Sequence, residues 1–284
     1  MSEEVKQGCA PSECGTKPAC AGCSHNHNNQ TAQPVKQPPK VRKVIGVCSG
    51  KGGVGKSLVS GELAVMLSRM GYRVGVLDAD ITGPSVPKMF GIHEKAYGDG
   101  EHIFPAETEK GVKLMSINLL LEQDDAPVIW RGPVIAGAVK QFWEDVTWGE
   151  LDVMVIDMPP GTGDVPLTVF QSIPVDGVVV VSTPQDLVGM IVRKAVNMAG
   201  MMKIPVLGLV ENMAYAVCPD CGKKIELFGK SRIAEEAAAL SLPVLAQLPF
   251  DPKAAQLCDE GAIETVDNPL MADAAVAIAG IVGL

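Results

Sequence analysis

The sequence has few aromatic residues, no long hydrophobic run and fewer basic than acidic residues. Aromatic residues make up only 4% of its 284 residues, but hydrophobic residues make up 47%. That share is enough for a sizeable core and excludes wholesale disorder. No apolar run approaches the ~18 residues of a membrane span, and the opening MSEEVKQGCAPSECG lacks the apolar centre of an export signal. The net charge of −9 argues against a general nucleic-acid binder. We therefore expect a cytoplasmic protein without membrane or nucleic-acid partners.

Cysteine, by contrast, is plentiful, and most of the eight cysteines are clustered. Four lie within the first 23 residues, namely Cys9, Cys14, Cys20 and Cys23. Cys218 and Cys221 form a C-x-x-C pair. In a reducing compartment, clustered cysteines favour metal or cluster ligation over disulfides. Cys48 ends a predicted strand and is expected to be a small buried hydrophobe, and Cys258 receives no role.

A change of composition near Lys43 divides the chain. Residues 1–43 contain much Pro, Asn, Gln and Lys, and the stretch SHNHNNQTAQPVKQPPKVRK offers no apolar face to offset the entropy of ordering. The charge changes at the same point, because this tail has six basic and three acidic residues and the remainder has 18 basic and 30 acidic residues. We therefore predict a cysteine-rich extension and linker over residues 1–43 and a folded domain over residues 44–284.

The folded part alternates between short apolar runs and helical stretches. The predicted strands are 44–48, 73–78, 151–157, 176–182 and 204–210, which read VIGVC, RVGVLD, LDVMVID, DGVVVVS and IPVLGLV. Continuous apolar runs are typical of a parallel sheet covered on both faces. The predicted helices are 56–70, 132–145, 186–201, 231–240 and 270–282. This alternation predicts a doubly wound α/β domain with ligands at the carboxyl ends of the strands. Residues 91–127 are the least regular part and are interpreted as an insertion.

The strongest local motif follows the first strand. Residues 50–57 read GKGGVGKS and fit the phosphate-loop pattern G-x-x-x-x-G-K-(S/T) between a strand and a helix. The glycines allow backbone N–H groups to close around phosphate oxygens, and the helix N-terminus adds a favourable dipole. Lys56 is expected to reach the β- and γ-phosphates, and Ser57 to ligate Mg²⁺. The predicted nucleotide-binding residues of this loop are Gly50, Lys51, Gly52, Gly53, Val54, Gly55, Lys56 and Ser57.

Three carboxylates are expected at the same sheet edge as this loop. Asp78 and Asp80 end the run RVGVLDAD, and Asp157 ends LDVMVID. Asp157 suits the role of holding a Mg²⁺-bound water, Asp78 could position the water shell of the metal, and Asp80 could orient the attacking water. The competing interpretation of each is a helix cap or a loop carboxylate.

A second lysine, Lys51, lies inside the loop. The pattern leaves two interpretations open. One is a solvated side chain. The other is a charge that meets phosphates across a dimer interface, as an arginine finger does.

Five blocks of sequence, in order, resemble the Mrp-type iron–sulfur cluster carrier ATPases of the deviant Walker A, MinD/ParA-like class. They read KGGVGKS, DADITGPSVP, DMPPGTGD, STPQDLVGMIVRKAVNMA and ENMAYAVCPDCG, and the resemblance covers residues 42–284. It implies a homodimeric ATPase in which Lys51 contacts nucleotide in the partner subunit. It also implies that Cys218 and Cys221 from two subunits bind one bridging [4Fe–4S] cluster. By resemblance alone, Asn212 and residues 249–252 are candidate adenine contacts.

The chemistry of the C-x-x-C supports a cluster independently. A [4Fe–4S] cluster takes four thiolates, and one pair per subunit supplies them on the twofold axis of a symmetric dimer. A thioredoxin-like redox pair should lie at a helix N-terminus, whereas CPDCGKKIELFG reads as a turn. A zinc site remains the main alternative, with Cys20 and Cys23 joining Cys218 and Cys221 in one chain.

The tail carries its own candidate site. Cys9, Cys14, Cys20 and Cys23 supply four thiols, enough for a complete cluster. Some members of the resembled family have an N-terminal ferredoxin-like cluster, but the cysteine spacing here differs from theirs. His25 and His27 could replace thiols, particularly for zinc, or could be solvated residues of the linker.

Three other functions share parts of this pattern. A septum-site or chromosome-partition ATPase shares the loop, but its membrane-binding form should end in a basic amphipathic helix, and the last 15 residues contain no Lys or Arg. A nitrogenase-type reductase takes its two ligands per subunit from separated segments rather than from one C-x-x-C. A nucleotide-gated zinc-binding module is the third alternative.

The sequence therefore predicts an ATP-hydrolysing iron–sulfur cluster carrier. ATP and Mg²⁺ are expected between two subunits, and switch segments after Asp78 and Asp157 are expected to carry the nucleotide state to the loop near Cys218. The expected partners are a second copy of the chain, a cluster-assembly donor and apo iron–sulfur proteins as recipients.

Overall fold

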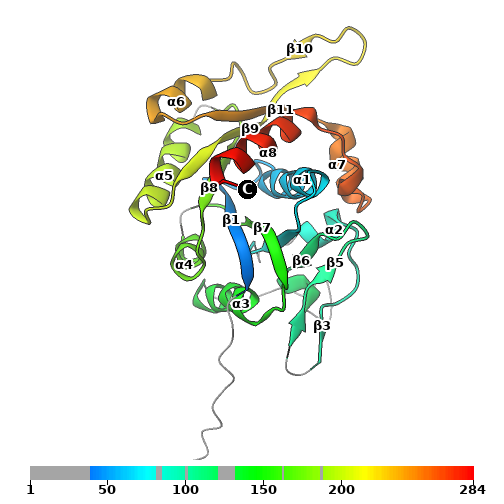
Figure 1. Ribbon diagram of the computed structural model, residues 1–284. Coiled ribbons are helices and arrows are strands. Elements are labelled where there is room, and N and C mark those ends of the chain that lie inside the picture. Colours follow the sequence, from blue (N-terminus) through cyan, green and yellow to red (C-terminus); the bar gives the residue numbers. More distant parts are fainter. Residues whose placement is uncertain (1–38, 81–84, 100–101, 121–131, 162, 186–187) are drawn as a thin grey trace, which may run out of the picture. The chain divides into compact units, whose positions relative to one another are not determined.

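The computed structural model of the chain describes residues 39–80, 85–99, 102–120, 132–161, 163–185 and 188–284 (Figure 1). The tail cysteines Cys9, Cys14, Cys20 and Cys23, as well as His25 and His27, lie outside the described residues.

A mainly parallel sheet forms the centre of the folded domain (Figure 1). Its middle strands are β8 (Gly177–Ser182), β1 (Lys40–Ser49), β7 (Glu150–Asp157) and β2 (Val74–Asp78), which lie side by side in that order. Every pairing among these four is parallel. Every residue of β2 and β8 is buried, as expected for a sheet covered on both faces.

Shorter or less regular strands extend the sheet at both sides. Next to β8 lies β9 (Val206–Val217), which pairs in parallel with β11 (Val244–Pro249) and, at its end, antiparallel with β10 (Lys224–Ile225). Next to β2 lies β6 (Lys113–Met115), followed by the antiparallel β5 (Ala106–Glu107). A separate hairpin joins β3 (Tyr97–Gly98) to β4 (Ile103–Phe104).

Helices cover both faces of the sheet, and alternate strand residues divide between two cores. On one face lie α1 (Lys56–Arg69), α2 (Val86–Met89), α7 (Pro252–Asp259) and α8 (Pro269–Val282). On the other lie α3 (Gly132–Asp145), α4 (Asp164–Ser172), α5 (Val188–Met201) and α6 (Ile233–Leu240). In β8, Val179 and Val181 pack with the first group, whereas Val178 and Val180 pack with the second, because side chains alternate across a strand. Two short 3₁₀ helices, Ile117–Leu119 and Ile263–Thr265, complete the elements.

The predicted elements agree with this arrangement in kind and mostly in extent. The predicted helix 132–145 coincides with α3, and those at 56–70 and 270–282 differ from α1 and α8 by one residue. The strand predicted at 44–48 begins earlier, at Lys40, so residues 40–43 belong to the sheet. The strand predicted at 204–210 continues to Val217. The predicted doubly wound α/β fold is confirmed.

The region interpreted as an insertion contributes to the sheet. β6 lies within residues 91–127 and pairs with β2 through Gly75, Val76 and Leu77. A strand of three residues is too short to leave a periodic signal, so the sequence pattern did not reveal it. No helix among the described residues is long and apolar enough to cross a membrane.

Candidate nucleotide and thiol sites

The glycine-rich loop leads directly from β1 into α1. Gly53 and Gly55 have φ values of 77° and 76°, a region that residues with a Cβ rarely adopt. Gly55 stands immediately before α1, and a Cβ on it would collide with the side-chain amide of Asn212. The loop can therefore hold this conformation only with glycine at position 55. The first turn of α1 presents backbone N–H groups without an intrahelical partner, which is the geometry of an anion site.

Asp157 is the centre of a buried polar cluster at the start of α1. Its Oδ1 lies 2.7 Å from Lys56 Nζ and accepts a 2.7 Å hydrogen bond from Ser60 Oγ, while its Oδ2 accepts a 2.6 Å bond from Ser57 Oγ. Lys56 Nζ also lies 3.4 Å from Asp80 Oδ2. The side chains of Lys56 and Asp157 are 6% and 0% exposed, so their charges are paired in a medium where an unpaired charge would be costly. The cluster brings Lys56, Ser57, Asp80 and Asp157 together.

Asp78 lies beside Asp157 on the neighbouring strand and is also buried. The two residues are in register across β2 and β7. Asp78 accepts hydrogen bonds from the backbone N–H of Asp80 (3.1 Å) and from Ser116 Oγ (3.1 Å). Burial, reinforced by the negative charge of Asp157, raises the pKa of Asp78 well above its ordinary value. This carboxyl therefore retains a proton more readily than an exposed aspartate does.

Sequence reasoning missed Ser60 and Ser116 at this site. Ser60 lies one helical turn after Lys56, and its Oγ lies 3.0 Å from the Lys56 carbonyl and 2.7 Å from Asp157 Oδ1. The i, i+4 spacing on α1 was therefore a usable signal. Ser116 directly follows β6, and no pattern in the sequence reveals that strand.

Lys51 is held within its own chain. Its Nζ donates a hydrogen bond to the side-chain carbonyl of Gln185, and its backbone carbonyl accepts a 2.9 Å bond from Ser49 Oγ. Gln185 belongs to the segment after β8 and was not predicted as a site residue. The side chain of Lys51 is partly exposed, so it can exchange Gln185 for another acceptor at low cost.

Asn212 connects β9 to the phosphate loop. Its Nδ2 donates a 3.0 Å hydrogen bond to the carbonyl of Val54, and its Oδ1 accepts a 2.9 Å bond from the backbone of Met213. The predicted adenine contact is thus engaged with the loop itself. Met213 has a φ of 54°, an uncommon value for a residue with a side chain.

A cavity of about 260 Å³ begins beside Asn212. It is bounded by α1, by the segment after β11 and by the start of α8. Its lining includes Leu58, Glu62, Asn212, Phe250, Asp251 and Asn268. The predicted adenine-contact segment 249–252 contributes Pro249, Phe250 and Asp251 to this wall. The cavity therefore joins the two predicted base contacts in one space next to the phosphate loop.

The C-x-x-C pair lies in a turn between β9 and β10. Cys218 donates its backbone N–H to the carbonyl of Lys223 (2.9 Å), and its own carbonyl accepts from the N–H of Gly222 (2.9 Å). Both thiols are free; Cys218 is partly exposed and Cys221 is exposed. The backbone N–H groups of Cys221 and Asp220, followed by the Cys221 side chain, hold the pKa of Cys218 below its ordinary value, which favours the thiolate that ligates metals. The prediction of a turn rather than a helix N-terminus is confirmed.

The remaining two described cysteines are buried. Burial raises the pKa of Cys48 to about 12 and that of Cys258 to about 11. Cys48 packs with the helices of the second face, as predicted for a small hydrophobe. Within the described part of the chain, no group of three or more His, Cys, Asp or Glu side chains is arranged to hold a metal ion. The C-x-x-C of one chain thus supplies only two ligands.

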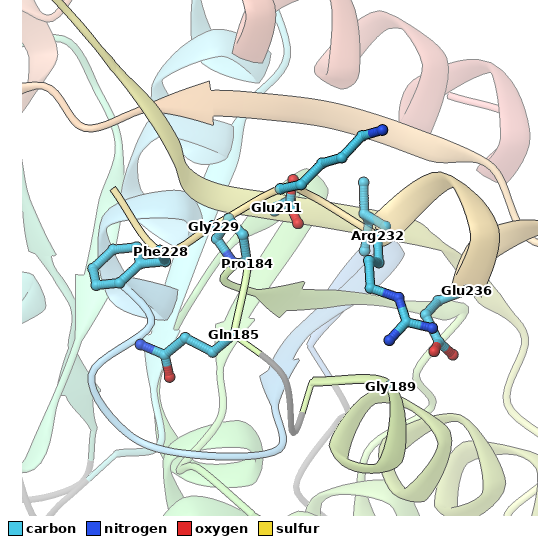
Figure 2. A pocket seen from close by; sticks show the side chains of 10 residues that line it. Pro184, Gln185, Gly189, Glu211, Phe228, Gly229, Arg232 and Glu236 are labelled. Atoms are coloured by element: carbon cyan, nitrogen blue, oxygen red, sulfur yellow. The ribbon is translucent and has the colours of Figure 1, made fainter. Parts of the chain in front are cut away.

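A smaller pocket lies between the end of β8 and the segment after β10 (Figure 2). Its volume is about 70 Å³. Figure 2 shows Phe228 and Gln185 on one side, Arg232 and Glu236 on the other, and Glu211 between them. Glu211 is buried and accepts hydrogen bonds from Ser231 (2.6 Å) and Gln247 (2.8 Å). The pocket is much smaller than the cavity beside α1, so it does not compete as a nucleotide site.

Comparison with known proteins places this geometry in a family. The family described as "ParA: NUBPL iron-transfer P-loop NTPase" matches residues 40–282. The chain belongs to this family. A protein named iron-sulfur cluster carrier protein from Clostridium perfringens is 47% identical over 270 residues, which cover 90% of this chain and 95% of that protein. A protein of the same name from Methanococcus maripaludis is 44% identical, with 92% and 90% of the two chains covered.

Solved structures of other proteins share the fold of this chain. A nucleotide-binding protein from Archaeoglobus fulgidus, solved in complex with ADP, is 43% identical with a TM-score of 0.74, covering 81% of this chain and 91% of that one. The MinC:MinD cell division complex from Aquifex aeolicus contains a chain that is 18% identical with a TM-score of 0.61, covering 84% and 96%. At that identity the likeness concerns the fold alone. The resemblance inferred from the five sequence blocks is confirmed.

Proposed function

We propose that this NTPase-family protein is an iron–sulfur cluster carrier that binds and hydrolyses ATP and transfers [4Fe–4S] clusters to apo-proteins. The observation that carries the proposal is the course of β9. This strand contacts the phosphate loop through Asn212 and Val54 and ends one residue before Cys218. One hydrogen bond and the covalent course of β9 therefore link the phosphate loop to the thiols. The names of the relatives from Clostridium perfringens and Methanococcus maripaludis support the same function.

The polar cluster supports a role in holding ATP and Mg²⁺. Mg²⁺ prefers hard oxygen ligands, and the hydroxyl of Ser57 with the carboxylates of Asp78 and Asp157 provides such a donor set at the start of α1. Bound there, Mg²⁺ would neutralise charge on the β- and γ-phosphates. In this proposal the backbone of residues 50–55 and Lys56 hold the phosphates.

Lys56 and Lys51 exchange partners in this proposal. Lys56 pairs with Asp157 and Asp80 in the described structure. When Lys56 turns to the phosphates, the carboxylate of Asp80 is released to orient the attacking water. Lys51 leaves Gln185 and reaches the nucleotide in a second copy of the chain, where its charge stabilises the charge that develops in the transition state.

The thiols act in pairs in this proposal. Cys218 and Cys221 of two copies supply the four thiolates that one [4Fe–4S] cluster requires. Their exposure at a turn allows the cluster to reach a recipient apo-protein. We place this activity in the reducing cytoplasm, where free thiols persist. The tail thiols Cys9, Cys14, Cys20 and Cys23 are proposed to hold a second cluster.

Anaerobic purification with counts of iron, sulfide and zinc tests the cargo, and two substitutions test its coupling to ATP. Lys51→Ala is expected to lower ATP hydrolysis, and Cys218→Ala is expected to lower cluster transfer to an apo-protein while nucleotide binding persists. The exposed Lys194→Ala and the buried Cys258→Ala serve as matched controls. Zinc without sulfide would favour the zinc-binding alternative. Full hydrolysis and transfer in both test variants would contradict the mechanism.

A further inference from the structure

The wall of the cavity beside α1 contains a buried carboxylate. Leu58 and Glu62 both line this cavity, and they lie one helical turn apart on α1, about 6 Å along its axis. Leu58 follows Lys56 and Ser57 immediately, so the cavity runs from the phosphate end of the helix down one side of it. Glu62 therefore lines the same cavity as the predicted base contacts, Asn212 and residues 249–251.

Glu62 has one oxygen bound and one oxygen free. The residue is 2% exposed, and its Oε2 accepts a 2.8 Å hydrogen bond from Asn268 Nδ2. Among the described residues, no hydrogen bond or ion pair reaches its Oε1. In the part of the chain that the structure describes, the fully enclosed side-chain oxygens without a partner are those of Ser182 and Thr183. Glu62 Oε1 is therefore not enclosed, and a ligand in the cavity can reach it.

The orientation of Asn268 is determined by the helix that it begins. Asn268 precedes α8, and its Oδ1 accepts from the backbone N–H of Met271 (3.3 Å). Its Nδ2 must therefore face Glu62. Asn268 can donate to Glu62 but cannot accept from it, so Asn268 occupies Glu62 Oε2 and leaves Oε1 without this partner.

We propose that Glu62 reads position 6 of the purine base and selects a 6-amino purine over a 6-oxo purine. This inference rests on the proposed nucleotide site and identifies a residue of this chain that gives the site its base specificity. The exocyclic amine of adenine is a donor and can satisfy Glu62 Oε1. The O6 atom of guanine or hypoxanthine is an acceptor and would face a carboxylate oxygen, which leaves both groups without a hydrogen bond.

The substitution Glu62→Gln reverses the hydrogen-bonding character of this position. Because Asn268 Nδ2 requires an acceptor, the side-chain carbonyl of the new glutamine faces Asn268 and its amide nitrogen faces the cavity. That nitrogen can donate to O6 but cannot accept from the 6-amino group. The contact with Asn268 that stabilises the start of α8 is retained, so the variant keeps its fold.

The comparison should be made where the parent carboxyl is ionised. Burial raises the pKa of Glu62 to about 7, the hydrogen bond from Asn268 opposes this shift, and the charge of Asp251 adds to it. The other titratable groups nearby are Cys258 on α7 and Asp267 before α8. We therefore choose about pH 8.5, above the Glu62 pKa but below that of Cys258.

The experiment measures the affinities of the full chain for ATP and for inosine triphosphate, with parent, Glu62→Gln and the exposed control Glu94→Gln. The parent and the control are expected to prefer ATP. Glu62→Gln is expected to lower the ATP to inosine triphosphate affinity ratio by roughly 10- to 100-fold. A circular-dichroism melt establishes that the variant is folded.

A second measurement needs no variant. Purine riboside triphosphate lacks any substituent at position 6 and is expected to bind the parent roughly tenfold more weakly than ATP. An unchanged affinity ratio in folded Glu62→Gln, or equal binding of ATP and purine riboside triphosphate by the parent, would overturn the role of Glu62 and leave the nucleotide site intact. A parent that binds none of these triphosphates would overturn the proposed function, and this inference with it.

Discussion

At the scale of single residues, Asp157 decides the electrostatics of the site. It forms an ion pair with Lys56 and accepts hydrogen bonds from Ser57 and Ser60. It also lies in register with Asp78 on the neighbouring strand. Its neighbour Asp78 carries a raised pKa, because burial and the negative charge of Asp157 both disfavour the ionised form of Asp78.

The substitution Asp157→Asn should affect both stability and hydrolysis. It removes the carboxylate that pairs with buried Lys56. The acidic partner that remains is Asp80, whose Oδ2 lies 3.4 Å from Lys56 Nζ. We expect a loss of roughly 2–4 kcal/mol in the free energy of unfolding and a fall in ATP turnover of at least ~100-fold. Urea denaturation and a phosphate-release assay measure the two effects.

The exposed residue Asp273 on α8 provides the matched control. Asp273→Asn should change neither quantity. If Asp157→Asn hydrolysed ATP at the parent rate, the proposed role of Asp157 would be wrong, whatever its stability.

At the scale of elements, α1 joins the phosphate loop to the cavity. Its first turn contributes Lys56 and Ser57 to the polar cluster, and its second contributes Glu62 to the cavity wall. Helix α1 is buried along most of its length, so its polar residues are placed for contacts inside the protein rather than for solvation. Because burial raises the pKa of Glu62 on this helix, we expect the stability of the protein to depend on pH.

Glu62 should make the protein less stable as the pH rises. Its pKa in the folded protein is about 7, above the ordinary value of 4.5, so the folded state holds this proton more tightly than the unfolded state does. The resulting stabilisation is complete below pH 4.5, falls between pH 4.5 and 7, and is absent above that range. Over this window the loss amounts to roughly 3 kcal/mol.

Comparison of Glu62→Gln with the parent isolates this effect. The difference in unfolding free energy between variant and parent should move in favour of the variant by the same roughly 3 kcal/mol between about pH 5 and pH 8. Urea denaturation at both pH values gives the difference, and Glu94→Gln should give none. A difference that is independent of pH would show that Glu62 titrates as an ordinary carboxyl.

The elements also show where sequence patterns fail. Long periodic helices such as α1, α3 and α8 were predicted within one residue. The elements α4, α7 and β11 were not predicted, because they are short and mix proline or polar residues with apolar ones. The extension of β9 to Val217 was missed for a related reason, since the polar residues Glu211 and Asn212 interrupt its apolar run although both are buried.

At the scale of the whole molecule, the proposed cargo requires more than one chain. The described residues of one chain provide two free thiols at the β9–β10 turn, and a [4Fe–4S] cluster takes four. The proposed function therefore ties cluster binding to association of two copies. It also separates a shared cluster from any cluster held by the tail of each chain.

Iron stoichiometry should distinguish the two sites. If each tail holds a cluster and two chains share another, the reconstituted protein contains about six iron atoms per chain. Replacement of Cys9, Cys14, Cys20 and Cys23 by serine should leave about two iron atoms per chain in a dimer. Iron and sulfide assays with light-scattering mass measurement follow both quantities. Serine at Cys218 and Cys221 should instead leave about four iron atoms per chain and abolish cluster-dependent association.

The outcome that contradicts this scheme is equally definite. A tail variant with about four iron atoms on a monomer would place a complete cluster on the folded domain of one chain. Such a result would require ligands beyond Cys218 and Cys221.

The sequence by itself determined the fold class, the phosphate loop and the thiol turn. These features are local: consecutive apolar runs specify buried strands, a glycine-rich loop between strand and helix specifies a phosphate site, and a C-x-x-C brings its own two sulfurs together. The resemblance of five ordered blocks likewise sufficed to identify the family.

Only the tertiary structure decided which distant residues meet. It set Ser60 and Ser116 beside the predicted aspartates, bound Asn212 to the loop at Val54, and closed α1, residues 249–251 and the start of α8 around one cavity. Among the residues that the structure describes, it also left one oxygen of Glu62 without a partner. Such contacts join residues up to 206 positions apart, as in the bond from Asn268 to Glu62. They depend on how strands order themselves and how helices pack, which no local pattern encodes.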